Sequence, residues 1–263
     1  MAGTRRSPRG KSADAVRAEL AEIFASRQGE GILLGIPQVF LRFSRCNLRC
    51  SWCDTPAGLR SNARYAVEPR PGGNPVFHQN PVTPPVVAGH LADFRKRMPF
   101  MRWVSLTGGE PLLYAPFLAA LLPGLRRDGW RIYLDTNGVL DAAMAALRRD
   151  VDLVAMDFKL DSSSGNGNLL PRHGAFLEAA GETDVFAKVV VTAETRITEV
   201  AAAAKLFARH RPEGTLVLQP VSPTPRFGLI PSPGQLDEFR RTAGRWVADV
   251  RVIPQMHKLL GIR

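Results

Sequence analysis

The sequence predicts an α/β protein built as a partial, incomplete parallel β/α barrel of about six strand–helix units. The first observation behind this prediction is that, beyond residue 100, short apolar runs of strand length alternate with longer amphipathic runs of helix length. The second is that this alternation stops short of the eight strands that a closed barrel requires. The third is size, because 263 residues with 45% hydrophobic content suffice for one α/β core.

The first part of the chain supplies two strands and an irregular segment. Apolar runs predict strands at about 21–27 and 38–43, with the glycine-flanked turn QGEG (28–31) between them. Residues 56–82 are rich in proline and glycine, and the sequence RPGGNP within them indicates a hairpin.

The rest of the chain continues with regular alternation. A helix is expected over 84–97, because Thr83 can cap its first turn and Pro85 is tolerated there. Further strands are expected at 102–107, 131–135, 152–157, 185–191, 215–219 and 249–254, and further helices at 114–127, 139–149, 197–210 and 233–243. A polar loop, SSSGNGN (162–168), follows the strand at 152–157.

The net charge of +11 raises a nucleic-acid hypothesis, which the distribution of the charges does not favour. Arginine pairs fall where expected helices end, at 126–127, 148–149 and 240–241. Cations in a last helical turn complement the helix dipole, so these pairs need no ligand. No stripe of basic residues interleaved with aromatics accompanies them. Anionic small molecules and an acidic electron donor therefore suit this charge better than RNA or DNA.

Hydropathy points to a cytoplasmic protein without a membrane segment. No apolar stretch reaches the roughly 18–20 residues that span a bilayer, and the N-terminal residues lack the apolar core of a signal peptide. Residues 1–15 form a basic tail that is expected to be disordered, with a transit peptide as the alternative. Residues 16–263 are expected to form a single domain in which 56–82 is an insertion or hairpin after the cysteine loop.

All three cysteines of the chain, Cys46, Cys50 and Cys53, fall in one C-x3-C-x2-C segment. In a reducing compartment such a cluster indicates a metal site before a disulfide framework. A structural zinc site takes four ligands, and the nearest following histidines, His78 and His90, lie outside the usual zinc spacing. Three thiolates on a four-iron cluster would leave one iron open to a ligand, which suggests catalysis. An unusual zinc site and three unrelated buried thiols remain the alternatives.

Polar motifs follow the carboxyl ends of six expected strands. They are the cysteine loop, TGGE (107–110), DTNG (135–138), DFK (157–159), LQP (218–220) and QMHK (255–258). In parallel α/β barrels that edge of the sheet carries the active site. Convergence of six motifs on one mouth predicts an enzyme, whatever its family.

The chain resembles the radical S-adenosylmethionine (SAM) enzymes in its cysteine spacing, in the aromatic residue before the last cysteine and in its GGE motif. Longer blocks resemble the 7-carboxy-7-deazaguanine synthases within that superfamily. These blocks are EIFASRQGEG (22–31), VFLRF (39–43), CNLRCSWCDT (46–55), SLTGGEPLL (105–113), DTNG, LQP and PQMHK (254–258). The resemblance implies a radical SAM core fold and a lyase that converts 6-carboxy-5,6,7,8-tetrahydropterin to 7-carboxy-7-deazaguanine with loss of ammonia.

The resemblance also implies the cofactors and the residues that hold them. A [4Fe-4S] cluster would be bound by Cys46, Cys50 and Cys53, and Mg²⁺ by Thr55. SAM would be bound by Trp52, Gly108, Gly109, Glu110, Asp157, Phe158 and Lys159, with Gln219 as a candidate for its ribose or adenine. Relatives often have Ser-Pro-Lys at 157–159, so Asp157 and Phe158 depart from the family pattern.

The substrate would be bound by Arg27, Gln28, Gly29, Glu30, Arg42, Thr107, Asp135, His257 and Arg263. Arg42 lies amid apolar neighbours and needs an anion, which is the substrate carboxylate or else Glu30 or Asp54. Asp135 stands where relatives often have glutamate. Arg263 follows His257 by only six residues, so its α-carboxylate is expected to pair with the pterin.

The sequence also suggests which partners the protein has and leaves alternative functions open. The chain contains no electron-transfer segment, so a flavodoxin- or ferredoxin-type donor is expected to reduce it, and relatives are often homodimers. A glycyl-radical-enzyme activase shares the cluster, the GGE motif and a small partial barrel. A non-enzymatic cluster or zinc protein that binds tRNA is the alternative from another class. The product could serve tRNA, DNA or a secondary metabolite.

Overall fold

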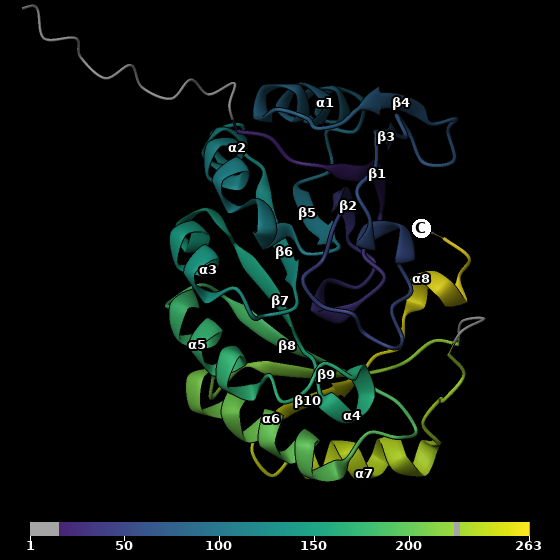
Figure 1. Ribbon diagram of the computed structural model, residues 1–263, viewed down its shortest axis with the longest axis vertical. Coiled ribbons are helices and arrows are strands. Elements are labelled where there is room, and N and C mark those ends of the chain that lie inside the picture. The colour runs from purple at the N-terminus through teal and green to yellow at the C-terminus, as the bar shows by residue number, and fades with distance from the viewer. Residues whose placement is uncertain (1–15, 224–226, 263) are drawn as a thin grey trace, which may run out of the picture.

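The computed structural model describes residues 16–223 and 227–262 of the chain. The predicted basic tail (1–15) and Arg263 lie outside the described residues. Figure 1 shows one curved sheet with a layer of helices along its outer side.

A single sheet contains all the named strands in the order β10-β9-β8-β7-β6-β5-β2-β1-β3-β4. The strands are β1 (Leu20–Arg27), β2 (Pro37–Phe43), β3 (Arg64–Val67), β4 (Val76–Gln79), β5 (Trp103–Gly108), β6 (Arg131–Thr136), β7 (Leu153–Phe158), β8 (Val185–Val191), β9 (Thr215–Pro220) and β10 (Asp249–Val252). Neighbouring strands from β2 through β5 to β10 are all parallel. Because β10 and β4 lie at opposite ends, the sheet does not close. The predicted partial barrel is confirmed.

The helices that connect the parallel strands form the outer layer. They are α1 (Pro84–Arg97), α2 (Ala115–Arg127), α3 (Asp141–Leu147), α5 (Leu170–Ala180), α6 (Ile197–His210) and α7 (Pro233–Ala243), and α4 (Asp161–Ser164) and α8 (Met256–Leu259) are single turns. The six longer helices pack side by side in chain order. Short 3₁₀ segments are η2 (Gly31–Leu33), η3 (Pro56–Leu59), η4 (Pro111–Tyr114) and η5 (Arg148–Asp150). None of the described helices is long and apolar enough to cross a membrane.

The central strands are apolar because both of their faces are covered. Every residue of β7 and β8 is buried. Phe158 on one face packs in the main core with the helices, whereas Phe186 on the other face packs in a second cluster with Tyr133. Buried parallel strands are expected to be apolar throughout. Asp157 and Lys188, which lie opposite each other in the β7–β8 register, are therefore exceptional.

Most expected elements are present, and the differences occur where local patterns are weak. The RPGGNP hairpin is β3–β4, whose first strand pairs with β1. Helix α5 was not predicted, because Pro171 and Gly174 weaken its helical pattern. The polar loop 162–168 begins within α4, and the last strand ends at Val252 before α8. Thr83 occupies the N-cap position of α1, but its side chain makes no capping hydrogen bond.

Candidate active site

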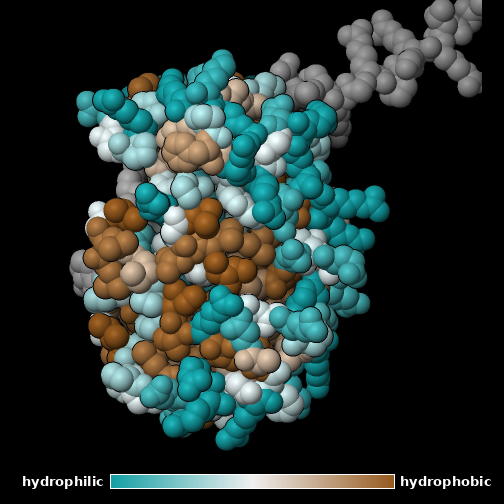
Figure 2. Space-filling view, turned by 180° about the vertical axis from the view of Figure 1, so that it is seen from behind, coloured by the Kyte–Doolittle hydropathy of each residue, from teal (hydrophilic) through white to brown (hydrophobic). Residues whose placement is uncertain are grey.

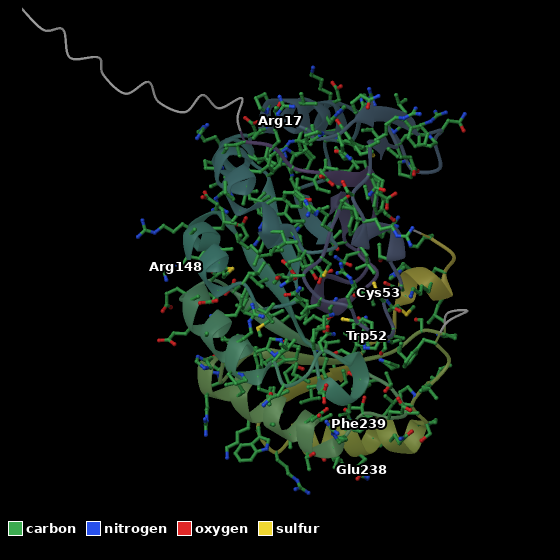
Figure 3. The ribbon with its side chains drawn as sticks, in the orientation of Figure 1. Arg17, Trp52, Cys53, Arg148, Glu238 and Phe239 are labelled. Carbon is green, nitrogen blue, oxygen red and sulfur yellow. The ribbon has the colours of Figure 1, made fainter. Side chains whose placement is uncertain are left out.

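A cavity opens at the carboxyl ends of the parallel strands, between the cysteine loop and α8. Its lining includes residues from all six predicted strand-end motifs. Figure 3 shows Trp52 and Cys53 next to each other beside α8, while Arg148 lies on the far side, among the outer helices. The predicted convergence of these motifs at one mouth agrees with this geometry.

Three thiols reach this cavity from the loop after β2. Cys46, Cys50 and Cys53 are partly buried and form no disulfide. The backbone N–H of Leu48 donates to Sγ of Cys46 at 3.4 Å, and Nδ2 of Asn137 lies 3.9 Å from the same sulfur. Over the described residues, no three or more cysteine, histidine or carboxylate side chains, these thiols included, are arranged to hold a metal ion. The donor set suits a cluster that needs three thiolates.

The GGE motif holds the end of β5 against the start of the cysteine loop. The N–H of Gly109 donates to the carbonyl of Phe43 at 2.9 Å, and the N–H of Glu110 donates to that of Arg45 at 2.9 Å. A Cβ on Gly109 would lie 1.9 Å from the carbonyl oxygen of Arg45, so any larger residue would force the two segments apart. Gly108 and Gly109 line the cavity as predicted.

Glu110, which is expected to contact the cofactor, has a fully buried side chain and does not itself line the cavity. Its carboxylate accepts from the N–H of Leu112 at 3.1 Å, the hydroxyl of Thr136 at 2.8 Å and the N–H of Asn137 at 2.8 Å. Burial raises the pKa of Glu110 to about 7, although these hydrogen bonds favour the charged form. The carboxylate thus fixes Asn137, whose amide in turn donates to Oδ1 of Asn47 at 2.8 Å.

The side chains of the DFK motif at the end of β7 point to two places: Asp157 and Lys159 line the cavity, and Phe158 lies in the core. Nζ of Lys159 pairs with Asp157 at 2.6 Å and lies 4.3 Å from the centre of the Trp52 ring. Burial would lower the pKa of Lys159, but the Asp157 carboxylate outweighs it and raises that pKa. The Phe158 side chain instead packs against His173 and Phe207, so it does not line the cavity. The prediction that Phe158 binds SAM is therefore corrected. Side chains alternate between the two faces of a strand, so Phe158 points away from the face on which Asp157 and Lys159 lie.

Five buried polar atoms of the cavity wall have no hydrogen-bond partner. They are Nε1 of Trp52, Oγ of Ser105, Oδ1 of Asn137, Oδ1 of Asp157 and Oε1 of Gln219. Buried polar groups are normally paired, so unpaired groups around a cavity indicate a polar ligand. Donor and acceptor atoms of this kind suit the amino acid and nucleoside parts of SAM.

Lys188 of β8 is the central cation of the site, and sequence reasoning missed it. Its Nζ lies 2.7 Å from Oε2 of Glu30, 3.2 Å from Oδ1 of Asp135 and 4.0 Å from Oδ2 of Asp157. Burial would lower the pKa of Lys188, but these carboxylates raise it well above its ordinary value. Burial likewise would raise the pKa of Glu30, yet Lys188 lowers it to about 2. A charged residue inside the apolar run VFAKVVV was the available signal.

The QGEG turn is bound to the C-terminal QMHK segment. Nε2 of Gln255 donates to Oε1 of Glu30 at 2.8 Å, and the N–H of Met256 donates to the carbonyl of Gly29 at 2.9 Å. A Cβ on Gly29 would lie 2.3 Å from Nδ1 of His257, so only glycine permits this approach. Gln28, through Oε1, accepts from the N–H of Glu30 at 3.2 Å. Gly29, Glu30 and His257 therefore reach the cavity as one unit.

Arg42 lines the cavity, but the carboxylate that pairs with it belongs to neither of the two residues named as alternatives. Its Nε pairs with Oε1 of Glu22 at 2.7 Å instead of with Glu30 or Asp54. Glu22 lies opposite Arg42 in the β1–β2 register, which explains the pairing. Thr107 donates to Oδ2 of Asp135 at 3.1 Å.

Asp54 and Thr55 occupy the cavity rim next to α8. Thr55 donates to Oδ1 of Asp54 at 3.1 Å, while Oδ2 of Asp54 accepts from Gln255 at 3.0 Å and pairs with Lys258. Burial would raise the pKa of Asp54, but Lys258 and the hydrogen bonds lower it to about 2. Besides Lys188, the site contains four residues that were not individually predicted to belong to it, namely Asp54, Asn137, Gln255 and Lys258.

Two predicted substrate-binding residues remain to be placed. Arg27 lines the cavity, whereas Arg263 lies outside the described residues.

Comparison with known proteins identifies the family of the chain. The family model of the radical SAM superfamily matches residues 40–176. A 7-carboxy-7-deazaguanine synthase of Geobacter sulfurreducens is 41% identical over 93% of this chain and 97% of its own length. Another from Methanopyrus kandleri is 37% identical over 91% and 92%. The crystal structure of QueE from Escherichia coli, at 20% identity and a TM-score of 0.58, covers 93% of this chain and 96% of its own and supports the fold. The chain belongs to the 7-carboxy-7-deazaguanine synthase family of the radical SAM superfamily.

Proposed function

We propose that the chain is a lyase that converts 6-carboxy-5,6,7,8-tetrahydropterin to 7-carboxy-7-deazaguanine with loss of ammonia. The observation that carries the proposal is that the resembling blocks, which lie far apart in the sequence, line one cavity. Relatives named 7-carboxy-7-deazaguanine synthase also match almost the whole chain.

Membership of the radical SAM superfamily implies a [4Fe-4S] cluster and SAM, and the residues present fit both groups. The three cysteines supply thiolates on one loop, and unpaired polar atoms of Trp52, Asp157 and Gln219 line the same cavity. When bound, the cluster and SAM supply the one-electron chemistry that removes a hydrogen atom from the substrate. The protein contributes position and exclusion of water.

The charges of the cavity match the polar groups of a carboxylated pterin. Glu30 and Asp135, which both pair with Lys188, offer acceptors to the ring N–H and amino groups. Arg42 contributes a guanidinium for the substrate carboxylate, with Glu22 holding its Nε. Since hydrogen bonds already fix these side chains, they orient the pterin at small entropic cost.

A magnesium ion at Thr55 is a further part of the proposal. The Thr55 hydroxyl and the Asp54 carboxylate are adjacent hard oxygen ligands at the cavity rim. The ion would bind there together with the substrate carboxylate and would act as a template.

Thr55→Ala is expected to lower kcat about tenfold and to raise the Mg²⁺ concentration needed for half-maximal rate, since one ligand is removed. Steady-state rates as a function of Mg²⁺ concentration measure both changes. Thr215→Ala, whose hydroxyl bonds to Asp249 far from the cavity, is the control. Unchanged magnesium dependence in Thr55→Ala would remove this residue from the metal site.

Two macromolecular partners belong to the proposal. An external flavodoxin- or ferredoxin-type protein would deliver the electron, and the basic net charge suits an acidic donor. A second copy of the chain would cover apolar surface: Figure 2 shows apolar side chains gathered on the face opposite that of Figure 1. Exposed apolar residues include Leu34 and Ile36 before β2 and Leu259 and Leu260 at α8.

The location of the protein in the cytoplasm stays a prediction from the sequence.

The test of the function is turnover of the reconstituted protein. With SAM, dithionite and Mg²⁺, it is expected to form 7-carboxy-7-deazaguanine, methionine and 5′-deoxyadenosine from the tetrahydropterin, as measured by liquid chromatography and mass spectrometry. SAM cleavage without conversion of the pterin would favour the activase alternative. Absence of SAM cleavage would favour the non-enzymatic one.

A further inference from the structure

The polar segment 161–168 lies against the cysteine loop, although sequence analysis gave it no function. The N–H of Ser51 donates to the carbonyl of Ser164 at 3.0 Å, and the Ser51 hydroxyl donates to the carbonyl of Ser163 at 2.8 Å. Two segments more than a hundred residues apart are thus joined at the middle of the C-x3-C-x2-C motif.

Asn166 completes this junction with both ends of its side-chain amide. Its Oδ1 accepts from the N–H of Arg49 at 3.0 Å, and its Nδ2 donates to Sγ of Cys50 at 3.3 Å and to the carbonyl of Ser164 at 3.2 Å. The orientation of the amide is therefore set by partners on both sides. One side chain contacts a cysteine and holds the backbone beside it.

Segment 161–168 is itself anchored to α6. Its first residue, Asp161, accepts from the N–H of Gly167 at 2.7 Å and pairs with Arg196 at 3.3 Å. The N–H of Ser162 donates to Glu199 of α6 at 3.1 Å. These contacts fix Asn166 relative to the helix layer, so its amide is preorganised before any cluster binds.

We propose that Asn166 is a positioning residue for the cluster: it orders the cysteine loop and donates a hydrogen bond to the Cys50 thiolate. The inference rests on the proposed use of the three cysteines as cluster ligands. Among the described side chains it is the closest donor to a cysteine sulfur, since Nδ2 of Asn137 lies at 3.9 Å from Cys46. Hydrogen bonds to cluster sulfurs stabilise the more negative, reduced state and raise the reduction potential.

The test compares Asn166→Ala and Asn166→Asp with Asn168→Ala. Asn168 lies in the same segment and accepts from the N–H of Leu170 at 3.1 Å, so its removal leaves the cysteine loop alone. Before reconstitution, Asn166→Ala is expected to speed hydrogen exchange at the Arg49 amide by about tenfold, whereas Asn166→Asp keeps the acceptor and the protection. After reconstitution, redox titration followed by electron paramagnetic resonance is expected to give both variants a more negative midpoint potential than the wild type.

Wild-type exchange and potential in Asn166→Ala would overturn the proposal, as would equal effects in Asn168→Ala. A wild-type potential in Asn166→Asp would overturn the hydrogen bond to Cys50. Neither measurement depends on which substrate is turned over, so failure of the proposed reaction would leave this result interpretable.

Discussion

Cys50→Ala is expected to abolish cluster binding and to reduce turnover to background. Wild-type protein reconstituted without oxygen should be brown and hold about four irons per chain, because three thiolates suit a [4Fe-4S] cluster. Cys50 contributes one of these three thiolates, and the chain has no fourth cysteine to replace it. Iron analysis and the visible absorption spectrum measure the loss directly.

Cys46→Ala and Cys53→Ala should behave in the same way, which tests whether the three thiols act as one set. Circular dichroism and thermal unfolding of the variants before reconstitution control for misfolding. A stable, colourless wild-type protein that holds one zinc ion would contradict the cluster, as would full iron retention in any of the three variants.

Lys188→Met is expected to have the largest effect on stability. Nζ of Lys188 compensates Glu30 and Asp135 and lies 4.0 Å from Asp157 in a buried site. Removing one partner of a buried ion pair leaves uncompensated charge and costs about 3–5 kcal/mol of unfolding free energy. Urea denaturation at pH 7 measures this loss. Lys96→Met, on the exposed surface of α1, should stay within about 0.5 kcal/mol of wild type.

The cost should depend on pH in a defined direction. The pKa of Glu30 is lowered to about 2, from an ordinary value of 4.5. A depressed carboxylate pKa stabilises the fold fully above the unfolded value, and this stability is lost as pH falls toward the folded value. The difference between wild type and Lys188→Met should therefore shrink as pH falls below about 4.5. The double variant with Glu30→Gln should cost less than the sum of the single variants, and strict additivity would show that the two residues are not coupled.

Local sequence was sufficient for the elements whose pattern is contained in neighbouring residues. Strand β8 and helices α1, α6 and α7 have the predicted bounds, because the pattern of apolar residues acts within a few positions. Helix α5 was missed because only packing against α3 and α6 stabilises its weak pattern. The single turn α8 depends likewise on the contact of Met256 with Gly29.

In the candidate site, too, some features could be predicted from local sequence and others could not. The cysteine spacing, the glycines of GGE and the polar strand ends are visible in the chain, and their positions at one sheet edge follow from parallel topology. The partners of Lys188, Arg42 and Asn166 could not be predicted, because strand register and a crossover of many residues bring them together. The core position of Phe158 and the buried position of Glu110 also follow from packing alone.

The fold class, the cysteine loop and the family of this protein can be recognised from the chain alone, because they depend on residue type, spacing and order. The tertiary structure decided which charges compensate each other around the cavity. Lys188 pairs with Glu30 across 158 positions, and Gln255 bonds to Asp54 across 201. Such pairs leave no local pattern, because the attraction that offsets the cost of burying the charges depends on their distance in the folded state.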